Sequence, residues 1–269
     1  MARTAAPALI PADIRLMNAT AAVLAALGVL ALVAVAILWA AHRPIFAVRA
    51  IKVDGDMAHN SVLTIRANAA PKLAGNFFTM DLAAGRRAFE SVPWVRQAIV
   101  KRVWPNKLAV QLEEHRAAAL WLPAGSGDET SDKLVNSYGE VFEANVGDVE
   151  DEALPTFSGP EGTSARMLAL FGLLQKEFAP MDAHIETLQL SGRGSWKVEL
   201  DTGSEVELGR GTDDEVIART RRFVATLPEV RSRYEQRPVT YADLRHNDGY
   251  AVRLKGITTS SDAGKSQKK

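Results

Sequence analysis

The 269-residue sequence contains no cysteine. This absence excludes disulfide bonds, thiol catalysis and thiolate metal sites. The sequence also has no net charge, because 32 lysines and arginines balance 32 aspartates and glutamates. There is therefore no overall basic field that would attract nucleic acid or anionic lipid to the whole chain.

The motifs of the common enzyme classes are absent as well. There is no G-x-S-x-G nucleophile elbow, and the G-x-G fragments at residues 192–194 and 209–211 lack the further glycine of a phosphate loop. None of the five histidines has the spacing of a metal ligand. Glu113-Glu114-His115 has the composition of an acid/base cluster, but its place at a strand end favours ordinary solvated charges. We therefore predict no enzymatic activity, no cofactor and no small-molecule substrate.

One long hydrophobic stretch is present, at residues 16–41, and it carries no charged side chain. A helix of this length, rising about 1.5 Å per residue, would span a hydrocarbon core about 30 Å thick. The alternative, a cleaved signal peptide, has a shorter apolar core of roughly 7–15 residues. We predict an uncleaved transmembrane helix at 16–41 with a cytoplasmic tail at 1–15. The flanking charges are nearly balanced, so the short tail before a long soluble region decides this orientation.

Residues 45–116 have the pattern of a strand, two helices and two strands. Ile51 and Val53 belong to the first strand, which is expected to begin at Phe46 and to end at Gly55. One helix runs from a cap at Ser61 to Pro71, and a second is capped by Asp81 or Thr79 and ends at Pro93. Pro105-Asn106 makes a turn between two strands. A three-stranded sheet covered by two helices is the compact arrangement of these elements.

Residues 117–256 form a second region of mixed character. Two short strands flank Tyr138-Gly139, and residues 164–178 form an amphipathic helix with Met167, Phe171, Leu174 and Phe178 on one stripe. A capping box at residues 212–215 begins a helix that runs to about Leu227. Residues 241–245 and 250–254 are the last strands, joined by a turn at 246–249. The predicted class is α+β with an antiparallel sheet in this second domain, followed by a disordered tail at 257–269.

The segment GNFFTMDLAAGRRAFESVPWVRQAIVKRVWPNKLAVQLEEHRAAALW, at residues 75–121, resembles the POTRA domain of the FtsQ/DivIB family of bacterial cell-division proteins. The resemblance rests on Asn76-Phe77-Phe78, Asp81-Leu82, Pro93-Trp94-Val95, Trp104-Pro105, Leu108, Val110 and Glu113-Glu114. Further along, SWKVELDTGSEVELGRG and YADLRHNDGYAVRLKG resemble the closing segments of the family's β domain. The resemblance covers residues 46–256 and implies a POTRA domain at 45–116 and a β domain at 117–256.

This resemblance implies a non-enzymatic scaffold of the divisome at the septum. The amino terminus would be in the cytoplasm and both domains in the periplasm of an inner-membrane protein. The implied partners are FtsB and FtsL, and also FtsK, FtsW, FtsI and FtsN. Trp94, Trp104 and Pro105 would be structural residues of the POTRA domain, with Trp104 and Pro105 fixing its turn and core.

The resemblance also places the FtsB site at the carboxyl end of the β domain, where a partner strand extends the sheet. The matching positions are Tyr241, Arg245, His246, Asp248, Gly249, Tyr250, Val252 and Leu254, with Arg193 beside them as a cation for an acidic partner segment. His246 stands where the family commonly has Tyr, and Leu254 where it often has Trp, so Tyr250 is expected to supply the aromatic anchor. The alternative for Tyr250 and Leu254 is ordinary packing of a terminal strand. The alternative for the whole chain is an anchored envelope assembly factor that handles strands at its POTRA edge, or a periplasmic enzyme.

Overall fold

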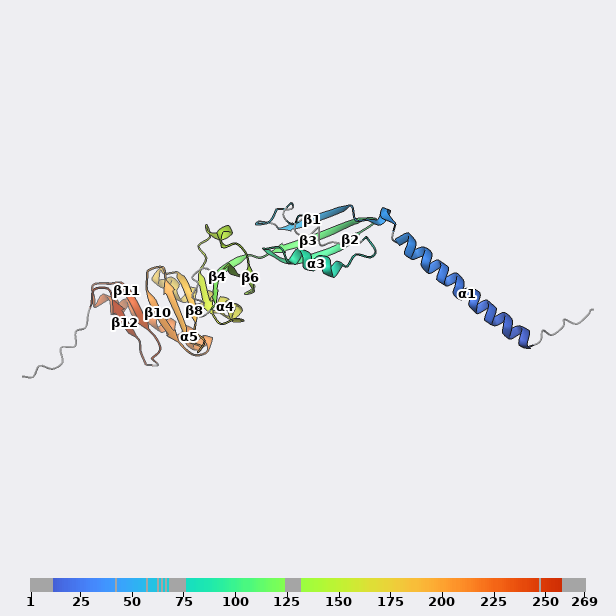
Figure 1. The fold of residues 1–269 in the computed structure, drawn as a ribbon. Helices are drawn as coiled ribbons and strands as arrows, with labels where there is room; N and C mark the ends of the chain where they lie inside the picture. The colour runs from blue at the N-terminus through green and yellow to red at the C-terminus, as the bar shows by residue number, and fades with distance from the viewer. Residues whose placement is uncertain are drawn as a thin grey trace, which may run out of the picture. The chain divides into compact units, whose positions relative to one another are not determined.

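The computed structural model describes residues 12–41, 43–56, 58–61, 63, 65, 67, 76–123, 132–246 and 248–257 (Figure 1). The chain divides into two compact units, residues 1–113 and 114–269, whereas the sequence placed the boundary after residue 116. Most of the predicted cytoplasmic tail and nearly all of the predicted disordered tail lie outside the described residues.

The first unit begins with α1 (Ala12–Ala41), which starts four residues before the predicted segment. Residues Asp13–Ala41 are long and apolar enough to cross a membrane. Large apolar side chains along this helix are exposed, as expected for a helix whose solvent is lipid. A short 3-10 turn, η1 (Pro44–Phe46), follows it.

The POTRA-type part of this unit contains β1 (Ala50–Asp56), α3 (Leu82–Glu90), β2 (Val95–Val103) and β3 (Lys107–Glu114). The sheet order is β1-β3-β2, and β1 runs parallel to β3. Of the first predicted helix, Leu63, Ile65 and Ala67 are helical, and the other residues of 62–71 lie outside the described residues. The predicted first strand begins too early, because Phe46 lies in η1 and Ala47 makes a single bridge with Asn76.

The core of this unit lies between β3 and the helical layer. Val110 and Leu112 of β3 pack in one cluster with Phe89, Val92 and Ile65, and each of the five is less than 5% exposed. The alternation predicted for β3 is therefore confirmed. The predicted cap of the second helix is confirmed too, because the Asp81 carboxylate accepts the Ala83 backbone N–H at 2.8 Å. Backbone N–H groups of Ala84 and Ala83 lower the pKa of Asp81.

The two tryptophans assigned to the POTRA core have different positions. Trp94 is 3% exposed and its ring stacks on His59 with centroids 3.9 Å apart. Trp104 is 73% exposed in the turn between β2 and β3, and its peptide bond to Pro105 is cis. The prediction that Trp104 fixes the core is wrong, because the hairpin carries this residue beyond the packed face of the sheet. The predicted position of the turn, at Pro105 and Asn106, is confirmed.

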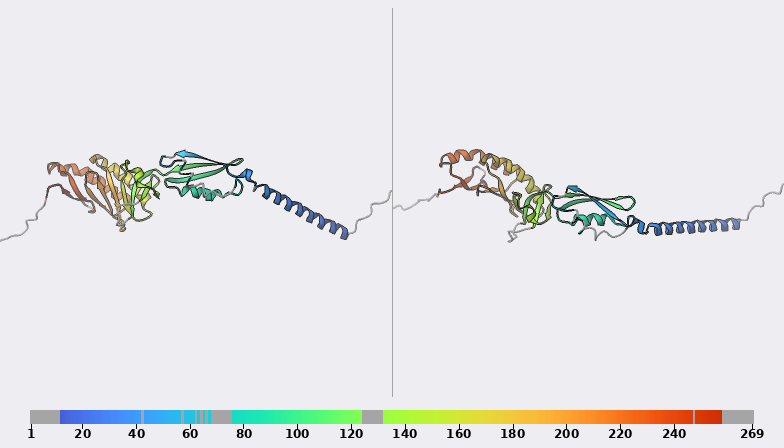
Figure 2. Two further views of the ribbon diagram at one scale, coloured as in Figure 1. Left: turned by 45° about the horizontal axis from the view of Figure 1, so that its top comes forward. Right: turned by 90° about the horizontal axis from the view of Figure 1, so that it is seen from above.

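The second unit is built on a nine-stranded sheet in the order β12-β11-β10-β9-β8-β7-β4-β5-β6. Its elements are β4 (Ala117–Pro123), β5 (Lys133–Asn136), β6 (Val141–Glu143), η3 (Val146–Val149), β7 (Thr156–Gly159), α4 (Ser164–Phe178), η4 (Ala179–Met181), β8 (Ile185–Leu190), β9 (Trp196–Leu200), β10 (Glu205–Gly209), α5 (Asp213–Ser232), β11 (Val239–Asp243) and β12 (Ala251–Leu254). The pairs β4·β7, β7·β8 and β10·β11 are parallel, so the sheet is mixed rather than purely antiparallel. Figure 2 shows α4 and α5 on the same face of the sheet.

The core of the second unit fills the space between this sheet and its two helices. Met167, Leu174 and Phe178 of α4 are fully buried, as the amphipathic stripe predicted, and Phe171 packs at its border. The capping box of α5 is confirmed, with Thr212 and Glu215 exchanging hydrogen bonds. This helix continues past Pro228 to Ser232 and ends five residues later than predicted.

Candidate partner-binding edge

The last strand, β12, lies at one edge of the nine-stranded sheet. It pairs antiparallel with β11, with Val252 opposite Ala242 and Leu254 opposite Val239. Among the described residues, no strand pairs with its other side. The predicted position of this strand at the sheet edge is therefore confirmed, although it begins at Ala251 rather than Tyr250.

The backbone of β12 alternates between its paired side and its open side. The Lys255 N–H donates to the Pro238 carbonyl at 3.0 Å, and the Thr240 hydroxyl donates to the Arg253 carbonyl at 3.1 Å. The backbone groups of residues 253 and 255 thus face β11. Because backbone direction alternates from one residue to the next in a strand, the N–H and C=O groups of Val252 and Leu254 point to the open side. Unpaired backbone groups at a sheet edge are a template for an added strand.

The side chains of β12 follow the predicted alternation, but the predicted binding face is the core face. The Tyr250 ring meets Phe223 edge-on at 5.1 Å, and its hydroxyl lies 2.7 Å from the Thr226 hydroxyl. Val252 packs against the same core, and Leu254 is only 6% exposed. For Leu254 in particular, packing of a terminal strand describes its surroundings better than contact with a partner. The contact of Tyr250 with Phe223 of α5 was not predicted from the sequence.

Arg245 is held by a carboxylate of its own chain. Its Nε and Nη2 donate to Oδ1 and Oδ2 of Asp243 at 2.9 and 2.6 Å, a two-pronged ion pair. Hydrogen bonding from Arg245 lowers the pKa of Asp243 to about 2. The charge of Arg245, one of the positions predicted to bind the partner, is thus already compensated within its own chain. Asp243 and Arg245 are two residues apart at the end of a strand, and this spacing is the sequence signal that indicates such an ion pair.

Arg253 is the cation that β12 itself presents. It is exposed, on the face opposite Leu254, and its guanidinium lies 5.6 Å from the centroid of the Tyr241 ring. In the part of the chain that the structure describes, Arg253 takes part in no ion pair. The side chain is therefore available to a carboxylate on a strand added at this edge.

Arg193 does not lie beside the edge. It is in the turn between β8 and β9, and both β10 and β11 lie between β9 and β12. At about 4.8 Å per strand, the three steps from β9 to β12 amount to roughly 14 Å. The prediction that Arg193 accompanies Tyr250 is wrong, because the order of the strands was not evident from the sequence. His246 and Asp248 are exposed in the turn before β12, and Gly249 is half-buried there.

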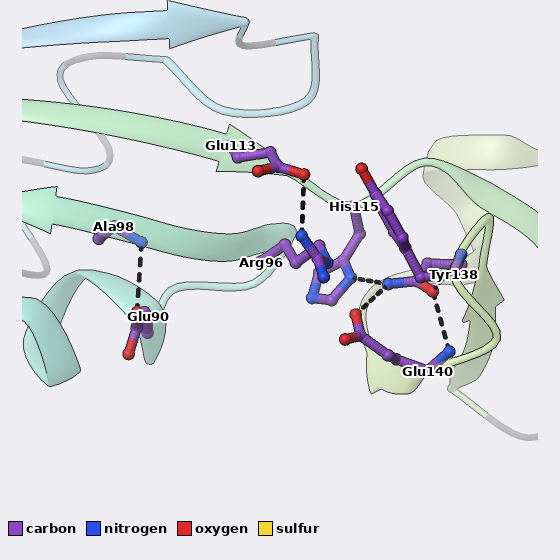
Figure 3. Close-up of polar contacts among 8 residues, drawn as sticks. Glu90, Arg96, Ala98, Glu113, His115, Tyr138 and Glu140 are labelled. Carbon is purple, nitrogen blue, oxygen red and sulfur yellow. Dashed lines mark hydrogen bonds and ion pairs between the residues drawn. The ribbon is translucent and has the colours of Figure 1, made fainter.

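Two side chains of the Glu113-Glu114-His115 stretch, Glu113 and His115, have hydrogen-bonding partners within their own units. Arg96 donates to Glu113 at 2.9 Å within the first unit (Figure 3). Within the second unit, His115 Nδ1 lies 2.8 Å from the Asn136 amide, and its ring stacks on Phe142. The side chains thus have separate structural partners. Glu114 is 8% exposed, so the prediction of a solvated charge is wrong for this residue. The described residues contain no group of three or more metal-binding side chains.

These features define a single-pass type of membrane protein with two folded units, one of POTRA type and one with a strand edge. Comparison with known proteins agrees. A family model for the POTRA domain of FtsQ type matches residues 46–115, and one for the C-terminal region of the cell division proteins FtsQ/DivIB matches residues 126–245. The second match ends before β12, so the edge strand itself lies outside it.

Individual relatives match most of the chain. The cell division protein FtsQ of Burkholderia pseudomallei is 42% identical over 257 residues, which cover 95% of this chain and 99% of that protein. The cell division protein FtsQ of Bordetella pertussis is 40% identical over 259 residues, covering 90% and 92% of the two chains. The chain belongs to the FtsQ/DivIB family of cell division proteins.

Proposed function

We propose that this protein is a non-catalytic divisome scaffold that binds FtsB by strand addition at β12, and through FtsB the partner FtsL. The observation that carries the proposal is the open edge of β12, with Val252 and Leu254 directing backbone groups away from β11. Membership of the FtsQ/DivIB family supports the division role. FtsK, FtsW, FtsI and FtsN are proposed as further partners on the resemblance alone.

Strand addition suits the chemistry of this edge. Affinity in this mode comes from main-chain hydrogen bonds, and specificity comes from alternate side chains. The core packs against the side chains of Tyr250, Val252 and Leu254. These side chains therefore hold β12 in place rather than select the partner. Arg253 faces outward and favours a partner strand with an acidic residue opposite it.

The proposed location is the inner membrane at the septum. The short segment before α1 would lie in the cytoplasm, and both folded units would lie in the periplasm. The apolar helix α1 supports a single-pass anchor. A reporter enzyme that is active only in the periplasm, fused after Gly256, should be active, and an inactive reporter would reverse the proposed orientation.

The binding proposal is tested with a pair of matched proline substitutions. Val252→Pro removes an outward-facing N–H from β12, and proline is tolerated at such edge positions. Val141→Pro makes the same change in β6, the strand at the opposite edge of the sheet. The Ala144 N–H donates to the Asp132 carbonyl, so by the alternation of the strand the Val141 N–H faces outward. The full-length protein in nanodiscs is titrated with the periplasmic segment of FtsB, and circular dichroism checks the fold.

We expect Val252→Pro to weaken binding by tenfold or more, in line with about 1.4 kcal/mol for a lost hydrogen bond and the strain around it. Val141→Pro should bind like the parent. Arg253→Glu should weaken binding more at low salt than at high salt. Equal affinity of folded Val252→Pro and the parent would place the FtsB contact elsewhere, and with it the proposal would fail.

A further inference from the structure

Large apolar side chains are exposed at one end of the POTRA-type unit. Four of them are between 42% and 73% exposed: Ile45, Phe78, Val103 and Trp104. They come from three segments, namely the residues after α1, the residues before α3 and the turn between β2 and β3. We call this set the proximal tip. Figures 1 and 2 show these segments at the end of the POTRA sheet next to η1.

Backbone contacts hold the three segments together. Phe77 donates its N–H to the Phe46 carbonyl at 2.8 Å, and the Phe46 and Phe78 rings meet edge-on at 4.9 Å. Arg49 donates its N–H to the carbonyl of Asn106 in the β2–β3 turn at 3.0 Å. The proximal tip is thus a built surface, because its parts are fixed by hydrogen bonds and ring packing.

The charge around the proximal tip is predominantly positive, although the exposed Asp81 carboxylate, which caps α3, follows directly after one of its segments. Residues 42–53, 73–80 and 97–112 contain no aspartate or glutamate. Six exposed cations come from these segments: Arg43, Arg49, Lys52, Lys101, Arg102 and Lys107. Lys52 pairs with Asp54 at 2.9 Å, and in the described part of the chain the other five take part in no ion pair. The chain as a whole is neutral, so this is a local field.

The tip is also tied closely to the membrane anchor. Ile45 is four residues beyond Ala41, where α1 ends, and Arg49 is eight residues beyond it. At no more than about 3.6 Å per residue, Ile45 lies within about 14 Å and Arg49 within about 29 Å of the helix end. Asn76, in the segment before α3, contacts the end of α1 directly, because its side-chain amide donates to the Ala41 carbonyl at 2.5 Å.

We propose that the proximal tip docks into the headgroup region of the membrane that α1 spans. Tryptophan prefers this region, where its ring meets the acyl boundary and its N–H meets water. Lysine and arginine side chains are attracted to an anionic lipid surface. The proximal tip is an exposed apolar patch with a basic rim, and it is tethered within a few residues of the bilayer. The bilayer is therefore the nearest apolar surface that can bury it.

The absence of cysteine makes the test direct, because a single introduced cysteine can carry the probe. An environment-sensitive fluorophore is attached at Val103→Cys, in the tip, or at Gln111→Cys, an exposed position on β3 four residues after Lys107. The full-length protein is placed in nanodiscs of phosphatidylglycerol and phosphatidylethanolamine that contain a headgroup-level lipid quencher. Two variants are added to the Val103→Cys background, Trp104→Ser and the double charge reversal Lys101→Glu with Lys107→Glu.

We expect the probe at 103 to be quenched and the probe at 111 not to be. Each added variant should reduce quenching at 103, and the charge reversal should do so most clearly at low salt. Unchanged quenching in both variants would mean that the tether alone brings the tip near lipid, which overturns docking. Lack of quenching at 103 would also overturn it and would leave the tip for a protein partner. Hydrogen exchange of β3 peptides confirms that each variant is folded, and Trp104→Phe should restore docking if Trp104→Ser loses it.

Discussion

Substitution of the two POTRA tryptophans by alanine should have opposite consequences for stability. Trp94 is 3% exposed and stacked on His59, whereas Trp104 is 73% exposed. Truncation of a buried tryptophan to alanine typically lowers stability by about 3–5 kcal/mol, because it removes apolar contacts and leaves a cavity. Truncation at an exposed site usually changes stability by less than about 0.5 kcal/mol.

For a module of this size the difference decides whether it folds. The POTRA match covers residues 46–115, and about 70 residues typically give roughly 3.5–10 kcal/mol of stability. Trp94→Ala would therefore remove a third or more of the free energy of unfolding of this module. Trp94 also has a φ of 69°, so alanine inherits an unfavourable left-handed backbone without the ring packing that offsets it.

Hydrogen exchange measured by mass spectrometry follows the two units of the full-length chain separately. In Trp94→Ala, peptides from β3 and α3 should exchange roughly 100- to 5,000-fold faster, the factor that corresponds to about 3–5 kcal/mol. Peptides from α4 and α5 should be unchanged, and Trp104→Ala should leave all peptides near the parent. Equal protection in the two variants would show that Trp94 contributes no packing, and the assignment of the core would be wrong.

Three further substitutions test the second unit. Leu254→Glu should lower its stability by about 3 kcal/mol or more, since a carboxylate would replace a buried side chain at the end of β12, and a fully protected β11 in hydrogen exchange would contradict this. Asp243→Asn should lower stability by about 1–2 kcal/mol at pH 7. Because the pKa of Asp243 is lowered to about 2 in the folded state, the stabilisation is complete above the unfolded pKa near 4 and is lost as the pH falls through about 2. Denaturant titrations of the variant and the parent should therefore converge at that pH. Thr212→Ala should remove about 1 kcal/mol through loss of the capping box of α5, while Ser232→Ala at the other end of the helix should change little.

Much of the fold could be predicted because its signals are local. The capping residue Asp81, the capping box at Thr212 and Glu215, and the helix from Ser164 each depend on a few neighbouring residues. The alternation of Leu108, Val110 and Leu112 is likewise local, and all are buried. These elements were therefore placed to within a few residues.

The errors come from features that depend on strand order or on the way a turn leaves the sheet. Arg193 lies in the turn before β9, and two strands of the sheet separate β9 from β12, an order that no local pattern encodes. Trp104 was assigned to the core through the family resemblance, yet it is exposed in the turn between β2 and β3. The mixed sheet was missed for the same reason, since the parallel pairs join strands that are far apart in the sequence.

The position of Leu254 changes the meaning of its departure from the family pattern. The resemblance implies tryptophan at this position, and its replacement suggested the loss of an aromatic partner contact. Leu254 faces the core, however, and β12 turns its backbone rather than this side chain to the open edge. A smaller residue at that place alters how β12 packs in the core and leaves the outward-facing hydrogen-bonding groups as they are. The same reasoning applies to Tyr250, whose ring is held between Phe223 and Thr226. The proposed strand addition at β12 would depend on the backbone of Val252 and the exposed side chain of Arg253, so a change at Leu254 or Tyr250 would leave those groups in place.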